Sequence, residues 1–462
     1  MQKTMQVFNA FDRQLITEIP TDDAHALEAK LSLLTQTFRD RPNWLKPHQR
    51  IKILKNTARL LETQIEKFGK LIAQEGGKPL TDALVEATRA VDGLDDAAEE
   101  LRNFGGQEIP MGLTPASDNR WAFTIKEPIG VVAAISAFNH PLNLIVHQIA
   151  PAIAIGCPVI VKPATTTPLC CIELIKLFRQ AGLDERWCQT LITEDNQLAE
   201  RLATDARIAF LSFIGSAKVG WYLKSKLAPG TRCALEHGGA APVLIDESAE
   251  LNKTIESIVK GGYYHAGQVC VSVQRIFVHK RILPDFMHRF IDRVQQLRVG
   301  DPLLKETEVG PLISPKEVQR VLSWISEAVA TGAQVFGGQR LSETTIAPTI
   351  LLNPALDAKV SQYEIFGPVT CVYEYEDLDW AIDMANSLPF SFQSSIFTSS
   401  LAPALHAAQR LDASAVFINE HTAFRVDWMP FAGRKQSGYG VGGIVWTMHE
   451  MSQDKMIVMK QD

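Results

Sequence analysis

The first quarter of the chain has the residue pattern of amphipathic helices. Between residues 22 and 105, apolar residues such as Ile53 and Leu60 recur at helical spacing, and Pro47 and the pair Gly76-Gly77 interrupt the pattern. A recurrence of this kind places the apolar side chains on one face of a helix. We therefore expect a helical lead-in.

After Gly130 the pattern changes to short, continuous apolar runs that alternate with segments of helical spacing. The runs cover residues 131–137, 159–161, 208–213 and 242–245. Continuous apolar runs suit strands that are buried on both faces of a parallel sheet, and their alternation with helices indicates a doubly wound α/β domain. For the helix after the second run, we expect Thr167 to cap the N-terminus and Pro168 to occupy the first helical position.

Beyond residue 261 the pattern predicts a second α/β unit. Its expected elements are strands at 275–279, 346–352 and 369–375 and helices at 284–297 and 315–331. Two further segments read as strands outside these units. Residues 119–128 alternate apolar and polar side chains, like a strand or hairpin arm, and residues 455–460 form a last strand that is exposed unless a partner covers it.

Composition indicates a globular protein of two or three domains, because 462 residues exceed one ordinary core and 46% of them are hydrophobic. The net charge is -6 and the basic residues form no dense run, which argues against a nucleic-acid partner. The N-terminus lacks the charged-then-apolar order of a signal peptide, and no apolar stretch reaches the roughly 18 residues of a membrane span. We expect a cytoplasmic protein without a membrane partner.

The seven cysteines include no C-x-x-C pair, so neither a disulfide framework nor a metal site is expected. A free cysteine is ordinarily a small buried hydrophobe. Cys270 differs in its surroundings, since Gly267-Gln268 allows a sharp turn before it and Val269 and Val271 flank it. Apolar neighbours raise the pKa of a thiol, so a reactive Cys270 requires backbone dipoles or a nearby base.

Two other polar residues stand where a ligand site is expected. Asn139 follows a buried strand directly, at the sheet edge where α/β proteins bind ligands, although an Asn before His-Pro is also a common turn residue. Glu236 precedes Gly238-Gly239, where the backbone can approach a ligand closely. Taken alone, Glu236 is an ordinary loop residue.

Simpler enzyme classes do not fit the sequence. Residues 215–220 have the outline of a phosphate loop, but Trp221 and Tyr222 stand where G-K-[ST] requires Lys and a hydroxyl. No G-x-G-x-x-G follows a strand near the N-terminus, and no papain-like signature surrounds Cys270.

Seven ordered motifs resemble those of the aldehyde dehydrogenase superfamily, and the similarity covers residues 7–460. Glu236 and Cys270 are separated as the general base and the nucleophile are in that family. The motifs are Phe138-Asn139 with Pro141, Lys162-Pro163-Ala164, Phe213-x-Gly215-Ser216, Glu236-x-Gly238-Gly239, Gly267-Gln268-x-Cys270, Glu364-x-Phe366-Gly367-Pro368, and Pro430-Phe431-x-Gly433 with Lys435 and Ser437-Gly438.

The resemblance implies an aldehyde-dehydrogenase-like α/β fold with three parts. These are a Rossmann-type cofactor domain formed by residues 1–117 and 129–237, an α/β catalytic domain at 238–450, and a small β oligomerisation arm formed by strands 118–128 and 451–462. Such arms join subunits, so a homodimer or a homotetramer is expected, and the sequence does not distinguish between them.

The resemblance also implies a reaction, the oxidation of an aldehyde to a carboxylic acid with reduction of NAD(P)⁺. The Cys270 thiolate would attack the aldehyde carbon, while the Asn139 amide and the backbone N–H of Cys270 hold the oxyanion. Glu236 would activate the water that hydrolyses the resulting thioester. A CoA-acylating relative would usually lack Glu236, and a catalytically silent binding protein would be expected to lose one of the three groups.

The cofactor implied by the resemblance is NADP or NAD. Its pyrophosphate would lie near the helix that opens at Ser216, and Glu364 and Phe366 would hold the nicotinamide ribose and ring. Thr165 stands where many NAD-preferring relatives carry a Glu that repels a 2′-phosphate, so we expect NADP⁺ to be accepted. The residues expected to bind the cofactor are Ser136, Ala137, Phe138, Lys162, Ala164, Thr165, Gly215, Ser216, Val219, Gly238, Glu364 and Phe366.

The substrate tunnel implied by the resemblance includes His140, Leu144, His147, Val269 and Val271. Histidines where many relatives place aromatics suggest a small polar, hydroxylated or anionic aldehyde, although each could be a core histidine bonded to backbone. Residues 424–430 look like a subgroup with lactaldehyde-like and phosphonoacetaldehyde-like dehydrogenases. Val269 provides no charge beside the cysteine, which weakens the case for a phosphonate anchor there.

Overall fold

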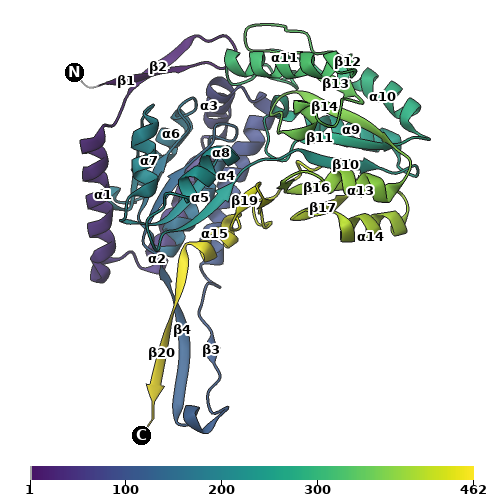
Figure 1. The fold of residues 1–462 in the computed structure, drawn as a ribbon. Helices are drawn as coiled ribbons and strands as arrows, with labels where there is room; N and C mark the ends of the chain where they lie inside the picture. Colours follow the sequence, from purple (N-terminus) through teal and green to yellow (C-terminus); the bar gives the residue numbers. More distant parts are fainter. Residues whose placement is uncertain (1–2, 462) are drawn as a thin grey trace.

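The computed structural model describes residues 3–461, which form two α/β lobes and a projecting arm (Figure 1). A six-stranded sheet in the order β19-β9-β8-β5-β6-β7 forms the first lobe, and all its neighbouring strands are parallel except the pair β19 and β9. Its strands are β5 (Val131–Ile135), β6 (Val159–Lys162), β7 (Cys188–Thr190), β8 (Ile208–Ile214), β9 (Arg232–Glu236) and β19 (Gly438–Tyr439).

Helices cover both faces of this sheet, which confirms the doubly wound prediction. In β5, Val132 and Ala134 pack with α2 to α6, whereas Val131 and Ala133 pack with α1 and α7 on the opposite face. The helices are α1 (Ala24–Arg39), α2 (Pro47–Glu62), α3 (Ile65–Gly76), α4 (Leu80–Glu100), α5 (Asn143–Ile155), α6 (Leu169–Gln180), α7 (Asn196–Thr204) and α8 (Ala217–Lys224). The expected helical lead-in is therefore present as α1 to α4.

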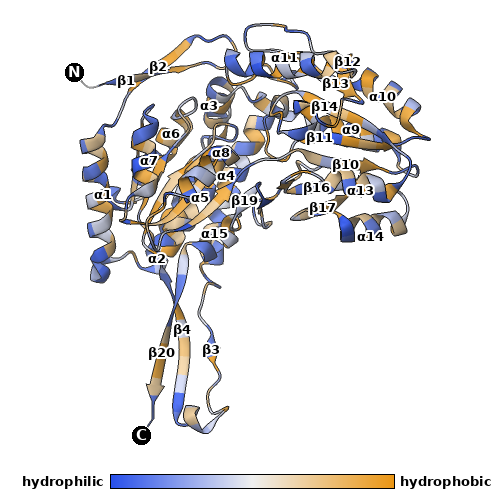
Figure 2. Ribbon diagram, viewed as in Figure 1, coloured by the Kyte–Doolittle hydropathy of each residue, from blue (hydrophilic) through white to orange (hydrophobic). Residues whose placement is uncertain are grey.

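The second lobe contains a seven-stranded sheet in the order β12-β13-β14-β11-β10-β16-β17. Hydrophobic residues concentrate in the strands of both sheets (Figure 2). The strands are β10 (Ala241–Ile245), β11 (Val273–His279), β12 (Gln334–Phe336), β13 (Thr349–Leu352), β14 (Val369–Tyr375), β16 (Gln393–Phe397) and β17 (Ala415–Ile418). The helices are α9 (Leu251–Tyr263), α10 (Leu283–Gln295), α11 (Pro315–Ala330), α12 (Lys359–Gln362), α13 (Leu378–Asn386) and α14 (Leu401–Arg410). The apolar run at 242–245 forms β10 and thus belongs to this sheet.

The arm is a three-stranded antiparallel sheet in the order β20-β4-β3, with β3 at Glu108–Ile109, β4 at Arg120–Pro128 and β20 at Ser452–Lys460. The pairing of β20 with β4 runs from Ser452 opposite Pro128 to Lys460 opposite Arg120. Both segments predicted as strands outside the two units are therefore strands, and they pair with each other. The remaining elements are β1 (Thr4–Phe8), β2 (Leu15–Pro20), β15 (Phe390–Ser391), β18 (Arg434–Lys435), α15 (Ile444–Glu450) and the short 3₁₀ helices η1 (Arg41–Asn43), η2 (Pro115–Ser117), η3 (Glu185–Trp187) and η4 (Tyr264–Gly267).

One local prediction, the cap of α6, is wrong. Thr167 makes no capping bond, and Pro168 precedes the first helical residue, Leu169. The carboxylate of Glu75, at the end of α3, instead accepts the backbone N–H groups of Leu169 and Cys170 at 2.8 and 2.9 Å. A cap supplied from a distant helix satisfies the same orphan donors that a local side chain would.

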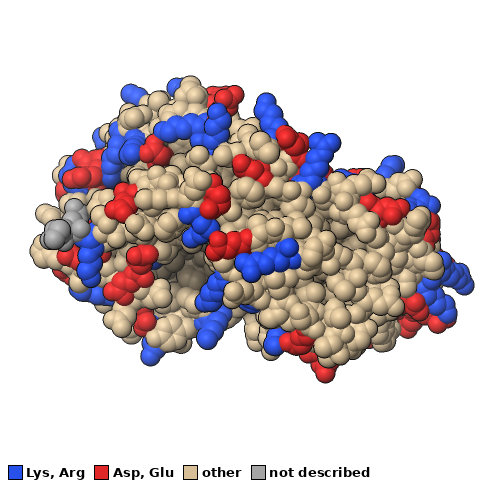
Figure 3. Space-filling model, turned by 90° about the horizontal axis from the view of Figure 1, so that it is seen from above, with Lys and Arg blue, Asp and Glu red and all other residues tan. Residues whose placement is uncertain are grey.

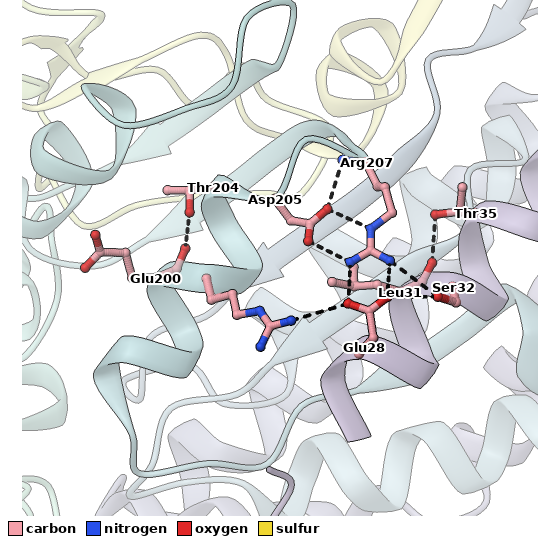
Figure 4. A network of polar contacts seen from close by, with 9 residues as sticks. Glu28, Leu31, Ser32, Thr35, Glu200, Thr204, Asp205 and Arg207 are labelled. Carbon is pink, nitrogen blue, oxygen red and sulfur yellow. Dashed lines mark hydrogen bonds and ion pairs between the residues drawn. The ribbon is translucent and has the colours of Figure 1, made fainter. Parts of the chain in front are cut away.

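Charged side chains of both signs are mixed over the face of the molecule seen in Figure 3. Figure 4 shows one polar network, in which Arg207 bonds both Asp205 and Glu28 and so links the turn before β8 to α1. Within residues 3–461, no helix combines the length and the apolar character that crossing a membrane requires.

The division of the chain into domains at residues 117, 129 and 237 stays a prediction. Residues 1, 2 and 462, which the predicted ranges include, lie outside the described residues. Residues 238–450 are predicted to form the catalytic domain, but β19 and α15, which fall in this range, pack in the first lobe. Ile444 and Met448 of α15 pack in the same apolar cluster as α5.

Candidate active site

A cavity of about 900 Å³ collects side chains from both lobes. Its walls come from the loops after β5, β9 and β17, the loop before β11 and the segment before β14. Residues of α4, α5, α11 and the start of α8 complete the lining. All three residues predicted to be catalytic and all five predicted for the tunnel line it. The predicted cofactor residues also line it, except Lys162 and Thr165.

A left-handed turn delivers Cys270 to this cavity. After α9 ends, His265, Ala266 and Gly267 have φ values of 49°, 53° and 68°. A Cβ atom on Gly267 would lie 2.1 Å from the carbonyl oxygen of Gly367, so glycine is required by space as well as by conformation. The sharp turn predicted before Cys270 is therefore confirmed.

Gln268 anchors this turn through its side chain. Its Oε1 accepts the backbone N–H of Ile313 at 2.9 Å, and its Nε2 donates to the carbonyl oxygens of His265 and Pro311 at 3.2 and 3.1 Å. The backbone carbonyl of Gln268 in turn accepts the side-chain amide of Asn139 at 2.9 Å. This fully bonded, buried residue fixes the nucleophile loop on two sides.

Asn139 is held from its own side as well. The N-terminus of α5, which follows its loop, is capped by Glu86, whose Oε1 accepts the N–H groups of Leu142 and Asn143 at 3.0 and 3.1 Å. Glu86 also pairs with the buried ammonium of Lys78. Because one N–H of the Asn139 amide binds Gln268, the second N–H remains for a ligand oxygen.

The surroundings of Cys270 disfavour its thiolate, as the sequence predicted. Burial, followed by the nearby carboxyl of Glu364, raises the pKa of the Cys270 thiol to about 12. Arg425 opposes this shift, and the backbone N–H of Cys270 also lowers the pKa of the thiol. From the sequence, a reactive Cys270 requires backbone dipoles or a nearby base. The structure shows a backbone dipole and, in place of a base, the positive charge of Arg425.

Glu236 is the last residue of β9, a strand that sequence reasoning missed. Burial raises the pKa of its carboxyl, and the charge of Arg425 partly offsets this. A Cβ atom on Gly442 would lie 2.1 Å from Glu236 Oε1, so this glycine makes room for the carboxyl group. A carboxylate with a raised pKa is a stronger base than an exposed one, which suits proton abstraction from water.

The geometry near Glu364 fits a nicotinamide cofactor. Its Oε1 is buried and has no hydrogen-bond partner within residues 3–461, and burial raises the pKa of its carboxyl to about 8. A Cβ atom on Gly238 would lie 1.6 Å from this oxygen. Phe366 has a φ of 48°, a strained backbone conformation, and its ring meets that of Phe138 edge to face at 5.8 Å between ring centres on the wall of the same cavity. A buried carboxyl oxygen without a hydrogen-bond partner among the described residues, on the wall of this cavity, can accept a ribose hydroxyl.

At the other side of the cavity, Ser216 is the residue before the first turn of α8 and makes no capping bond of its own. Lys162 and Thr165 lie beyond the cavity wall. Burial lowers the pKa of Lys162, whose Nζ donates to the carbonyl of Pro163 at 3.1 Å, and Thr165 is half-buried. Their predicted contacts with the adenosine end stay predictions.

Both predicted tunnel histidines have side-chain partners, and neither ring is bonded to the backbone of the described residues. His140 Nε2 shares a hydrogen bond of 3.0 Å with the hydroxyl of Tyr264, and His147 Nε2 lies 2.6 Å from Asp427. Val269 and Val271 are buried beside Phe431 in a small apolar cluster.

Sequence reasoning missed several charged residues at the site. They include Arg89 from α4, Arg425 and Asp427 from the loop after β17, and Lys218, Glu317 and Arg320 on the cavity wall. Arg89 and Arg425 line the cavity, and Asp427 bonds Arg89 behind it. The only signal for Arg425 and Asp427 was the run 424–430, which was recognised by subgroup likeness and not by chemistry.

Comparisons with known proteins agree with this geometry. Residues 1–457 match the aldehyde dehydrogenase family. The chain is 35% identical to a 3-sulfolactaldehyde dehydrogenase of Priestia megaterium, over 98% of this chain and 94% of that protein. Among solved structures, glyceraldehyde-3-phosphate dehydrogenase GapN of Methanocaldococcus jannaschii complexed with NADP superposes with a TM-score of 0.95, at 33% identity and 100% coverage of both chains. Aldehyde dehydrogenase 21 of Physcomitrella patens, in complex with the reaction product succinate, gives a TM-score of 0.95 at 31% identity, covering 99% of this chain and 95% of the other.

Proposed function

The chain belongs to the aldehyde dehydrogenase family, and we propose that this NAD(P)-dependent enzyme oxidises a small polar aldehyde to the free acid through Cys270, Asn139 and Glu236. The observation that carries the proposal is the meeting of these residues, from three distant segments, on the wall of one cavity. The Asn139–Gln268 bond ties the oxyanion donor directly to the nucleophile loop.

In the first step the Cys270 thiol releases its proton to solvent water, helped by the charge of Arg425, and the thiolate sulfur attacks the aldehyde carbon. A C–S bond forms while the carbonyl π electrons move to oxygen. The second N–H of the Asn139 amide and the backbone N–H of Cys270 hold this oxyanion. Donors already fixed by Gln268 and Glu86 need little reorganisation as the charge develops.

NAD(P)⁺, when bound, would supply the acceptor for the hydride of the substrate carbon, which would leave a thioester on Cys270. Gly238, Glu364 and Phe366 would hold the ribose and ring, with Ser216 and Val219 near the pyrophosphate. Glu236 then takes a proton from a water molecule, whose oxygen attacks the thioester carbon. The C–S bond breaks, the thiolate is restored and the acid leaves, after which Glu236 releases the proton to solvent.

An acyl transfer to coenzyme A is the alternative use of the same thioester. The presence of Glu236 on the cavity wall favours hydrolysis, because attack of water on the thioester requires a general base as well as the cysteine. Mass spectrometry of the product distinguishes a free acid from an acyl-CoA. A product found only as acyl-CoA would overturn the hydrolytic assignment.

The proposed nucleophile is tested with an aldehyde panel and both cofactors, following NAD(P)H absorbance. Cys270→Ser should abolish aldehyde-dependent NAD(P)H formation, a loss of at least about 10³-fold in kcat. Cys233→Ser, a buried cysteine outside the cavity, is the matched control. Full activity of Cys270→Ser would show that another group is the nucleophile.

We further propose that the arm joins subunits in a dimer or a tetramer. Trp121, Met456 and Val458 are 51%, 58% and 46% exposed on β4 and β20. Within residues 3–461, the outer edge of β20 has no paired strand. An exposed apolar strand edge of this kind is ordinarily covered by another chain.

A further inference from the structure

Four side chains form a continuous polar chain beside the proposed tunnel. Arg89 binds Asp427 with both arms of its guanidinium, at 3.0 Å from Nε and 2.8 Å from Nη2. His147 Nε2 lies 2.6 Å from the same carboxylate, and its Nδ1 lies 3.3 Å from Nη2 of Arg425. Arg89, His147 and Arg425 also line the cavity, so the chain ends at the substrate space.

The donors in this chain fix the protonation of His147. Because an arginine can only donate, Nδ1 of His147 accepts from Arg425, and the ring proton therefore lies on Nε2 and is donated to Asp427. Burial and the charge of Arg425 lower the pKa of His147, which keeps the ring neutral. Although burial opposes ionisation of Asp427, hydrogen bonds from His147 and Arg89 hold the pKa of its carboxyl well below the usual range.

The charges do not cancel. Asp427 neutralises Arg89, His147 is neutral, and Arg425 remains as the surplus cation among these four side chains. Its Nε is buried and has no hydrogen-bond partner within residues 3–461, and its guanidinium lies 3.6 Å from the centre of the Phe431 ring. The neighbouring carboxyl group, Glu236, cannot serve as a permanent partner, because it must be free to accept a proton from water.

We propose that Arg425 binds a singly charged acidic group, a carboxylate or a sulfonate, at the far end of the aldehyde. The planar fork of a guanidinium matches either group with paired hydrogen bonds. Arg89, Asp427 and His147 are positioning residues that hold Arg425 in place. A doubly charged group such as a phosphonate would bring a second charge that lacks a partner in a largely desolvated site, which is costly. This inference rests on the proposed function and specifies its substrate class.

The test compares aldehydes that differ only in the terminal group. Sulfoacetaldehyde and malonic semialdehyde carry one charge, phosphonoacetaldehyde is nearly isosteric with the sulfonate but more highly charged, and propanal is neutral. We expect kcat/KM to favour the singly charged pair over propanal by about 10- to 100-fold, the range that hydrogen bonds to a charged group supply. Phosphonoacetaldehyde should rank below sulfoacetaldehyde.

Arg425→Gln should remove most of this preference, chiefly by raising KM for the charged aldehydes. Arg425→Lys, which keeps the charge and loses the fork, should be intermediate. Arg102→Gln, at an exposed arginine after α4, is the control and should leave the ratio between sulfoacetaldehyde and propanal unchanged. Binding of the product sulfoacetate, measured by calorimetry, should weaken in Arg425→Gln by a similar factor.

Three outcomes would overturn the inference while leaving the proposed function intact. The first is equal use of propanal and sulfoacetaldehyde by the unmodified enzyme, and the second is a preference for the phosphonate. The third is an Arg425→Gln enzyme that loses rate equally with every aldehyde, which would make Arg425 only a counter-ion for Cys270 and Glu236. Absence of oxidation with every probe would contradict the proposed function, and the sulfoacetate titration would still test the anchor.

Discussion

The side-chain amide of Asn139 donates a hydrogen bond of 2.9 Å to the backbone carbonyl of Gln268, two positions before the cysteine. This bond joins the loop after β5 to the turn before β11. The second N–H of the same amide is left for the proposed oxyanion. The nitrogen of Asn139 therefore both fixes the nucleophile loop and would stabilise the oxyanion. The first prediction follows from that double use.

Asn139→Ala should lower kcat/KM by about 10²- to 10³-fold, the usual effect of losing one oxyanion donor. Steady-state kinetics with a saturating cofactor measure this loss. Asn103→Ala, at an exposed asparagine after α4, should leave kcat/KM unchanged. Unchanged kinetics in Asn139→Ala would remove this residue from the oxyanion site.

Glu236→Gln should separate the two halves of the reaction. Thioester formation should persist, giving a burst of NAD(P)H equal to the enzyme concentration, while turnover falls by about 10²- to 10⁴-fold because water lacks its base. Rapid-mixing absorbance and the intact mass of the acyl-enzyme detect the two effects. Glu66→Gln, at an exposed position on α3, should turn over normally. A lost burst with normal turnover afterwards would contradict the assignment.

Thr165→Glu should shift cofactor use away from NADP⁺. A carboxylate at this half-buried position would repel the 2′-phosphate, and we expect the ratio of kcat/KM for NADP⁺ to that for NAD⁺ to fall at least about tenfold, equivalent to about 1.4 kcal/mol. Thr165→Gln, which has similar bulk and no charge, is the control. If the unmodified enzyme rejects NADP⁺ as strongly as Thr165→Glu does, Thr165 does not set the cofactor preference.

Glu75 should make stability fall as pH rises toward neutrality. Burial raises the pKa of this carboxyl to about 7 in the folded protein, against about 4.3 in an unfolded chain. The folded state therefore prefers the protonated form, so its advantage is present below about pH 4.3 and is lost as pH rises to about 7. The loss can reach about 3 kcal/mol. Urea unfolding across that interval should show a shallower pH dependence for Glu75→Gln, and an identical slope would refute the prediction.

The arm should control assembly. The double variant Met456→Glu, Val458→Glu should shift the enzyme toward monomer in light scattering, because the two glutamates place charge on the exposed apolar strand. Leu401→Glu on α14, at a residue that is 72% exposed, should not alter the assembly. An unmodified enzyme that is already monomeric would contradict the oligomer proposal.

The elements that sequence predicted well are those with a strong local pattern. The apolar runs of β5, β8 and β14 and the periodic segments of α2 and α4 are dictated by burial alone. β9 escaped prediction because its five residues, RCALE, begin and end with charge and follow a polar stretch. Its position in the sheet is decided by pairing with β8 and β19, which no local pattern reveals.

The same distinction applies to the site. Cys270, Asn139 and Glu236 could be proposed because motifs at family spacing surround them. The hydrogen-bonded series of side chains that runs from Arg89 through Asp427 and His147 to Arg425 could not be predicted. Its members come from α4, α5 and the loop after β17 and become neighbours only when the lobes meet. The cap of α6 failed for a related reason, because Glu75 lies on another helix and competes successfully with the adjacent Thr167.

The pairing of β19 with β9 constrains the order in which the first sheet can form during synthesis. Glu236 lies opposite Gly438, so the strand that ends in the proposed base acquires its outer neighbour only after the entire second sheet has been synthesised. A nascent chain emerging from the ribosome can therefore assemble most of the first sheet early, as N-terminal units generally do. It cannot complete the edge that carries the base until translation is nearly finished, so a prematurely terminated chain would be left with an unfinished active site.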